Sequence, residues 1–118
     1  MKTKDDNIIV QKSYLFAVRC VNVYKYLCEK DHDYIIGKQL MRSGTSVGAN
    51  VKEAIRGISR AEFRSKMSIS LKEASESEFW IELLRDTGYL TEQQADSLLN
   101  DCQELLKLLM TIVKSSKE

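Results

Sequence analysis

The sequence predicts an all-α protein, an up-down-up-down antiparallel four-helix bundle formed by a single domain over residues 1–118. Three observations support this fold class. The chain has no proline, the residue that breaks helix interiors and favours turns. Apolar residues recur three or four positions apart in four segments of similar length. Short polar or glycine-containing breaks separate these segments, as is typical of bundles with brief turns.

The first helix is expected from about Asn7 to Lys30. Its main apolar row consists of Ile9, Phe16, Cys20, Val23 and Leu27. Further apolar and aromatic side chains lie beside this row, so the apolar surface is wider than a helix that faces a single core requires. Two interpretations stay open: a central helix with several neighbours, or a helix that also lines a subunit interface.

The second helix is expected to follow the polar break at residues 30–33, which supplies an aspartate as N-cap. Gly44 occupies a missing core position in its apolar row, and Gly57 is expected at the C′ position in the left-handed conformation. The other members of the row are Ile36, Leu40, Val47, Val51, Ala54 and Ile58.

Capping boxes mark the start of the two remaining helices. Ser59 and Glu62 predict the start of the third helix, and Thr91 and Gln94 predict the start of the fourth. Gly88 is expected to end the third helix, whose inward-facing row consists of Phe63, Met67, Ser70, Ala74, Ser77, Ile81 and Leu84. The fourth helix carries its apolar residues on one face, namely Ala95, Leu98, Leu99, Cys102, Leu105, Leu106, Leu109, Ile112 and Val113.

Small residues concentrate in the middle of the second and third helices. On the second they are Ser43, Gly44, Ser46, Gly48 and Ala49, and on the third Ser70, Ala74, Ser75 and Ser77. Glycine inside a helix costs about 1 kcal/mol relative to alanine, so both glycines need a packing reason. We expect that reason to be a close approach of these two helices.

Polar residues lie in the same region and predict a structural polar seam between the second and third helices. Its expected members are Arg42, Asn50 and Glu53 on the second helix, opposite Glu73 and Glu76 on the third. Partnered charges in such a seam would fix the register of the helices.

Catalytic and metal-binding motifs are not supported. Residues 44–48 match G-x-S-x-G, but that nucleophile elbow requires a strand-to-helix turn, and this segment lies in a helical pattern. The only histidine, His32, has no cysteine at zinc-ligand spacing. We therefore expect no catalytic residue, no metal and no cofactor, and interpret the protein as a non-enzyme.

Charge is distributed unevenly, although the formal net charge is only +1. Residues 38–72 carry eight basic residues and two acids, whereas residues 73–104 carry nine acids and one base. If the helices alternate in direction, one end of the bundle becomes basic and the other acidic. The basic end would hold Lys2, Lys4, Lys12, Lys52, Arg56, Arg60, Arg64, Lys66, Lys114 and Lys117, and the acidic end Glu78, Glu82, Asp86, Glu92 and Asp96.

Such a polarity has two interpretations. In the first, the basic end is a phosphate-binding surface, and its binding is strongest where several subunits present it together. In the second, the charges are solvated and form ion pairs along each helix. The three cysteines, an odd number without C-x-x-C spacing, favour reduced thiols in a cytoplasm. No apolar run has the length of a membrane span, so we expect no membrane association.

The run of residues 39–54, QLMRSGTSVGANVKEA, resembles a family of bacterial four-helix-bundle proteins encoded by intervening sequences in 23S ribosomal RNA genes, the S23 ribosomal protein family. A second block at residues 66–84 strengthens the resemblance. The family includes the accessory variability protein of diversity-generating retroelements, a ring-forming pentamer with a basic surface that binds a reverse transcriptase and nucleic acid. The resemblance implies a homo-oligomer, expected to be a homopentamer, with Lys52, Arg56, Arg60 and Arg64 as counterparts of the basic surface.

Two functions are therefore carried forward. The first is a homo-oligomeric helical scaffold whose basic end binds RNA or a nucleic-acid-bound protein such as a reverse transcriptase, through Lys52, Arg56, Arg60, Arg64 and Lys66. The second is a protein-only adaptor that binds a partner protein through the apolar surface of the first helix or through the acidic end.

Overall fold

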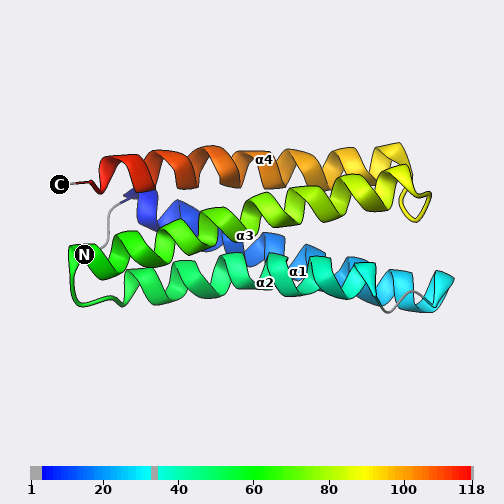
Figure 1. The fold of residues 1–118 in the computed structure, drawn as a ribbon, viewed down its shortest axis with the longest axis horizontal. Helices are drawn as coiled ribbons and strands as arrows, with labels where there is room; N and C mark the ends of the chain where they lie inside the picture. Colours follow the sequence, from blue (N-terminus) through cyan, green and yellow to red (C-terminus); the bar gives the residue numbers. More distant parts are fainter. Residues whose placement is uncertain (1–3, 33–34, 118) are drawn as a thin grey trace.

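The described part of the chain folds into four helices that lie side by side along one long axis (Figure 1). They are α1 (Lys4–Asp31), α2 (Ile36–Ile55), α3 (Arg60–Asp86) and α4 (Glu92–Ser115). The structure is a computed structural model that describes residues 4–32 and 35–117 and measures 46 × 20 × 19 Å. Each helix packs against the next in the chain, and α1 also contacts α4. The predicted all-α four-helix bundle is confirmed.

The alternation of the helices brings distant parts of the sequence to the same end. The start of α1, the α2–α3 turn and the end of α4 lie together, and the α3–α4 turn lies at the other end beside the end of α1 (Figure 1). The arrangement that the charge analysis assumed is therefore the one observed.

Apolar side chains from all four helices fill the core, and they are the ones that the periodicity selected. Among the largest that are fully buried are Phe16, Leu27, Leu40, Met67, Ile81, Leu84, Leu105 and Leu109. Ile58 is the exception, because α2 ends at Ile55 and the Ile58 side chain is 94% exposed in the turn that follows. Its placement in the apolar row of the second helix was wrong.

Helix ends follow the predicted caps in part. Thr91 and Gln94 form both hydrogen bonds of a capping box at the start of α4. At the start of α3, Ser59 Oγ accepts from the Glu62 N–H, but the Glu62 carboxylate accepts from the Ile58 N–H and not from Ser59. The N-cap position of α2 is Ile35, without a side-chain cap hydrogen bond, so the aspartate N-cap predicted from residues 30–33 was wrong. Of the two aspartates in that break, Asp31 is the last residue of α1, and Asp33 lies outside the described residues.

The two glycines predicted at helix ends behave differently. Gly88 has φ +87°, the left-handed conformation expected after α3. Gly57 does stand at C′, directly after the C-cap Arg56, but its φ is not positive, so the predicted left-handed conformation was wrong. A Cβ at Gly57 would lie 3.0 Å from Glu62 Oε1 and 3.1 Å from the Ala54 carbonyl oxygen, so the need for glycine there is steric.

The small residues of α2 contact two neighbouring helices, α1 and α3. A Cβ at Gly44 would lie 2.3 Å from Cys20 Sγ, and one at Gly48 would lie 3.2 Å from the Ser13 carbonyl oxygen, both on α1. Contact with α3 is made by serines: Ser43 Oγ and Ser77 Oγ are 2.8 Å apart. The prediction that the glycines face the third helix was wrong.

None of the helices within the described residues has both the length and the apolar character that crossing a membrane requires.

Candidate nucleic-acid interface

Exposed cations surround the α2–α3 turn. Lys52 is in the last turn of α2, Arg56 is the C-cap residue of α2, and Arg60 is the first residue of α3. All three side chains are exposed, and none of them makes an ion pair within the described part of the chain. Their charges are therefore available to an external anion.

The other two predicted cations are placed differently. Lys66 Nζ lies 2.9 Å from Glu53 Oε1, so its charge is matched across the α2–α3 contact. Arg64 is half-buried, and its Nε is shielded from solvent without a hydrogen-bond partner among the described residues. The five predicted residues thus gather at one end, but only Lys52, Arg56 and Arg60 form an open, unmatched cluster.

The turn that carries these cations is held by hydrogen bonds that backbone N–H groups donate to one backbone carbonyl and two side-chain oxygens. The Gly57 N–H donates to the Ala54 carbonyl at 3.0 Å. The Ile58 N–H donates to Glu62 Oε1 at 3.1 Å, and Ser59 caps α3. Arg56 and Arg60 therefore project from a fixed turn on either side of the exposed Ile58.

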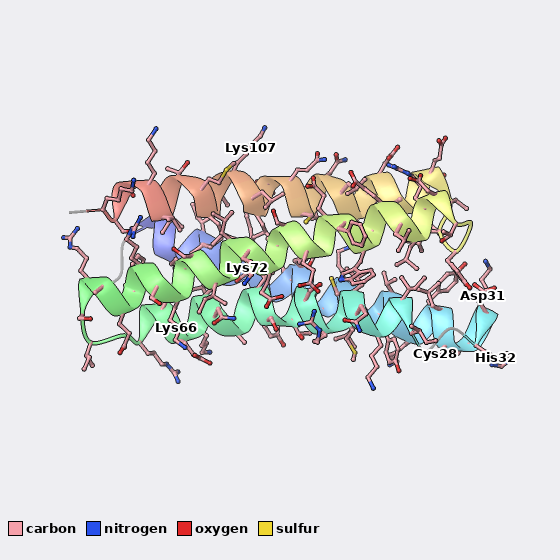
Figure 2. The ribbon with its side chains drawn as sticks, in the orientation of Figure 1. Cys28, Asp31, His32, Lys66, Lys72 and Lys107 are labelled. Atoms are coloured by element: carbon pink, nitrogen blue, oxygen red, sulfur yellow. The ribbon has the colours of Figure 1, made fainter. Side chains whose placement is uncertain are left out.

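Further cations extend the basic end. Lys114 lies in the last turn of α4 and Lys117 just beyond it, both exposed. Lys12 is matched by Glu104, with Nζ and Oε2 3.1 Å apart. Lys2 lies outside the described residues, and only the backbone of Lys4 is described. Figure 2 shows Lys66 in the half of the molecule that contains the α2–α3 turn, and Asp31 and His32 at the opposite end.

The structure brings together part of the predicted polar seam. The Arg42 guanidinium donates to Glu76 and lies 3.8 Å from Glu73 Oε1, and Trp80 Nε1 donates to the same Glu76 carboxylate at 3.0 Å. Asn50 instead donates to the Ser46 carbonyl of its own helix at 2.8 Å. Glu53 pairs with Lys66, nearer the basic end. The seam is thus one ion cluster around Arg42, with Asn50 and Glu53 outside it.

Residues singled out for chemistry lie in different elements. Ser46 lies in the interior of α2, a helix, and not on the strand-to-helix turn of a nucleophile elbow. His32 follows α1 with φ +52°, near the opposite end from the basic cluster. No group of three or more metal-ligating side chains occurs among the residues that the structure describes.

The buried cysteines are poor nucleophiles. Burial raises the pKa of the Cys102 thiol to about 12, and it also raises the pKa of Cys20. Both therefore remain protonated at neutral pH, and a protonated thiol is unreactive.

An apolar surface lies along the outer face of α1. Tyr14 is 67% exposed and Leu15 is 61% exposed, with Val18 and Tyr26 further along the same helix. Beside it, α1 and α4 border a groove of about 470 Å³ whose walls include Asn22, Tyr26, Leu90, Gln93 and Leu98. Arg19 spans the two helices next to the groove and pairs with Asp101 at 2.6 Å.

Sequence reasoning found the wide apolar face of the first helix but missed the groove and the exposed Ile58. Ser59, already recognised as an N-cap, was the signal for Ile58, because a residue directly before an N-cap cannot be in the preceding helix's core row. The groove left no such signal, since it depends on how far α1 and α4 separate.

Comparisons with known proteins support one relationship. The family described as 23S rRNA-intervening sequence protein matches residues 5–111. Among solved structures, the chain is similar to a protein of unknown function from the S23 ribosomal protein family of Bacteroides thetaiotaomicron. The two are 49% identical, the match covers 93% of this chain and 98% of that chain, and the TM-score is 0.91. Comparison with curated proteins gives no match.

Proposed function

Since the chain belongs to the family of 23S rRNA-intervening sequence proteins, we propose that it is a non-enzymatic, homo-oligomeric helical scaffold whose basic end binds RNA. One observation carries the proposal: Lys52, Arg56 and Arg60 are exposed and unmatched around a single fixed turn. A cytoplasmic location fits a chain whose three cysteines are present as thiols.

Electrostatics explains how a nearly neutral protein can bind RNA. Charges beyond about 10 Å are screened at ordinary ionic strength, so the acidic end, on a molecule 46 Å long, does not cancel the field at the basic end. Each phosphate neutralised by a cation releases a counterion, which favours binding and makes it salt-dependent. A few cations give weak binding, and several copies side by side would add their contributions.

The apolar face of α1 supports the oligomeric part of the proposal. Tyr14, Leu15 and Val18 are exposed on one helix face, although burial of such side chains is favourable. A second copy that covers this face would bury them, and a ring built in this way could present its basic ends together. Leu15→Glu would place a charge in that contact, and we expect it to convert the oligomer to monomer in light scattering. A wild-type protein that is monomeric would contradict this part.

The test of RNA binding compares two charge reversals of equal size. Arg56→Glu with Arg60→Glu removes the open cluster, and Lys25→Glu with Lys38→Glu changes the net charge equally in the half of the bundle that contains the α1–α2 turn. All four residues are exposed. We expect the first variant to lose binding to a fluorescein-labelled RNA hairpin in anisotropy titrations, and the second to retain it.

Salt dependence gives the second readout. Wild-type affinity should fall as the salt concentration rises, with a slope that decreases by about one for each phosphate-contacting cation removed. Equal binding by the two variants would contradict the proposal, because binding would then follow bulk charge and not the turn. Absence of wild-type binding at low salt would contradict it as well.

A protein-only adaptor remains the second candidate, and the exposed face of α1 with its neighbouring groove favours it. This function predicts a monomer whose α1 face is available to a different protein. A nucleic-acid-free monomer in light scattering, with an absorbance ratio at 260 and 280 nm typical of protein alone, would favour the adaptor over the scaffold.

A further inference from the structure

The α2–α3 turn places an isoleucine at the centre of the basic cluster. Ile58 is 94% exposed, the highest value among the exposed large apolar side chains of the described residues. Arg56 precedes it by two positions and Arg60 follows it by two. Its backbone N–H is fixed by Glu62, so the side chain is presented from an ordered turn.

Packing does not account for an isoleucine at this position: Ile58 directly precedes the N-cap Ser59, but at 94% exposure it is not packed in a staple against Phe63. The side chain belongs to no core cluster, because α2 has already ended at Ile55. Turn positions favour Gly, Pro, Asn, Asp and Ser, each of which offers a backbone conformation or a hydrogen bond that isoleucine does not. The two neighbours of Ile58 in this turn are residues of that kind, with Gly57 before it and Ser59 after it.

We propose that Ile58 covers the exposed face of a base at a bulge in the RNA, while Arg56 and Arg60 contact the phosphates on either side. This inference rests on the proposed function and names the RNA that the basic end prefers. Apolar side chains with basic neighbours are a recurrent means of occupying an unstacked step in a nucleic acid. In RNA such steps occur at bulges, loops and ends, where bases lack a stacking neighbour.

A lipid surface fits the same turn less well. Peripheral membrane binding needs an apolar face that penetrates the headgroup region, because its strength scales with the buried apolar area. Here the apolar group is a single side chain, and the nearest apolar residues of the flanking helices, Ile55 and Phe63, are already packed against the core. One side chain is enough to cover one base, so the dimensions of the turn favour the RNA.

The experiment uses two RNA hairpins of one sequence, one with a single-nucleotide bulge flanked by 2-aminopurine and one fully paired. Burial of one isoleucine side chain is worth about a tenfold preference, so the wild type should bind the bulged hairpin about tenfold more tightly. It should also change the 2-aminopurine fluorescence. Ile58→Ser should lose the preference and the fluorescence change while it still binds the paired hairpin.

The chain provides a matched control for this substitution. Ile35, in the turn at the opposite end, is 75% exposed, and Ile35→Ser removes the same apolar group away from the basic cluster. This control should retain the preference for the bulge. Ile58→Ser replaces an exposed side chain, so circular dichroism should show unchanged helicity and melting. Ile35→Ser places a favoured capping residue at the N-cap of α2, so it should melt at the same or a slightly higher temperature.

The other outcomes of the experiment distinguish failure of this inference from failure of the proposed function. Equal affinity of the wild type for both hairpins, with Ile58→Ser unchanged, would overturn the inference and leave the proposed function intact. No binding to either hairpin would contradict the proposed function and the inference with it. Flotation of the wild type, but not of Ile58→Ser, on phosphatidylglycerol vesicles without RNA binding would assign the turn to a lipid surface.

Discussion

Gly44→Ala tests the closest contact in the bundle, where α2 meets α1. The new Cβ would lie 2.3 Å from Cys20 Sγ and 2.8 Å from Cys20 Cβ. Carbon atoms in contact prefer about 3.5–4.0 Å, so the second contact falls short by about 1 Å. The sulfur can rotate about χ1, but Cys20 Cβ is fixed to the backbone, so α1 itself has to move.

The free energy has two opposing parts. Alanine is a better helix former than glycine by about 1 kcal/mol. Overpacking a filled core costs about 1–3 kcal/mol, and the upper part of that range applies where backbone has to shift. We therefore expect Gly44→Ala to lower the free energy of unfolding by about 1–2 kcal/mol, which corresponds to a melting temperature lower by about 3–8 °C.

The assay is thermal and urea unfolding followed by far-ultraviolet circular dichroism. Gly48→Ala is the matched control, because its Cβ would lie 3.2 Å from the Ser13 carbonyl oxygen, a tight contact that a small shift relieves. We expect it to change stability by less than about 1 kcal/mol, since the helix propensity gain offsets the contact. Adding Cys20→Ala to Gly44→Ala should recover little of the loss, because the contact with the Cβ at position 20 remains. A Gly44→Ala protein as stable as the wild type would refute the packing argument.

Three further predictions concern the cap, the buried serines and the thiols. Thr91→Ala removes the α4 capping box and should cost about 1 kcal/mol of stability in urea unfolding; an unchanged midpoint would contradict the cap's role. Ser77→Ala leaves Ser43 Oγ without its 2.8 Å partner in the core and should cost about 1 kcal/mol, whereas Ser75→Ala, at an exposed site, should be nearly neutral. The pKa of Cys102 rises from 9.0 unfolded to about 12 folded, so its contribution to stability is present below pH 9 and is lost as pH rises toward 12. Cys102→Ala should flatten the fall in unfolding free energy over that range, and a parallel pH profile would contradict the burial argument.

Much of the fold follows from local signals in the sequence. The apolar rows of the four helices identified the core residues because each buried helix face repeats every 3.6 residues. Thr91 with Gln94 and the glycine at 88 fixed helix ends because capping depends on neighbouring residues alone. The shared location of the α2–α3 turn and the end of α4 followed from helix alternation.

Details that depend on the rotation of one helix against another were not predictable. Ser43 and Gly44 are adjacent in sequence and about 100° apart around the helix, so they face α3 and α1 respectively. Periodicity marks both as core-facing but does not name the neighbour. The same holds for the candidate site, where Lys66 is matched by Glu53 and Arg56 is unmatched. Only the structure shows which of these two cations forms an ion pair.

The contact between α1 and α4, the α1–α4 seam, has a consequence for how the bundle folds and opens. Among the described residues it is the one helix contact between elements that are not consecutive in the chain, and it contains the groove and the ion pairs Lys12–Glu104 and Arg19–Asp101. Contacts between consecutive helices close short loops and form early, whereas this seam joins the two extremes of the sequence. We expect the helical hairpin α2–α3 to form first and the seam to close last. In native-state hydrogen exchange, the amides that border the seam should then exchange through a partial opening of lower free energy than global unfolding.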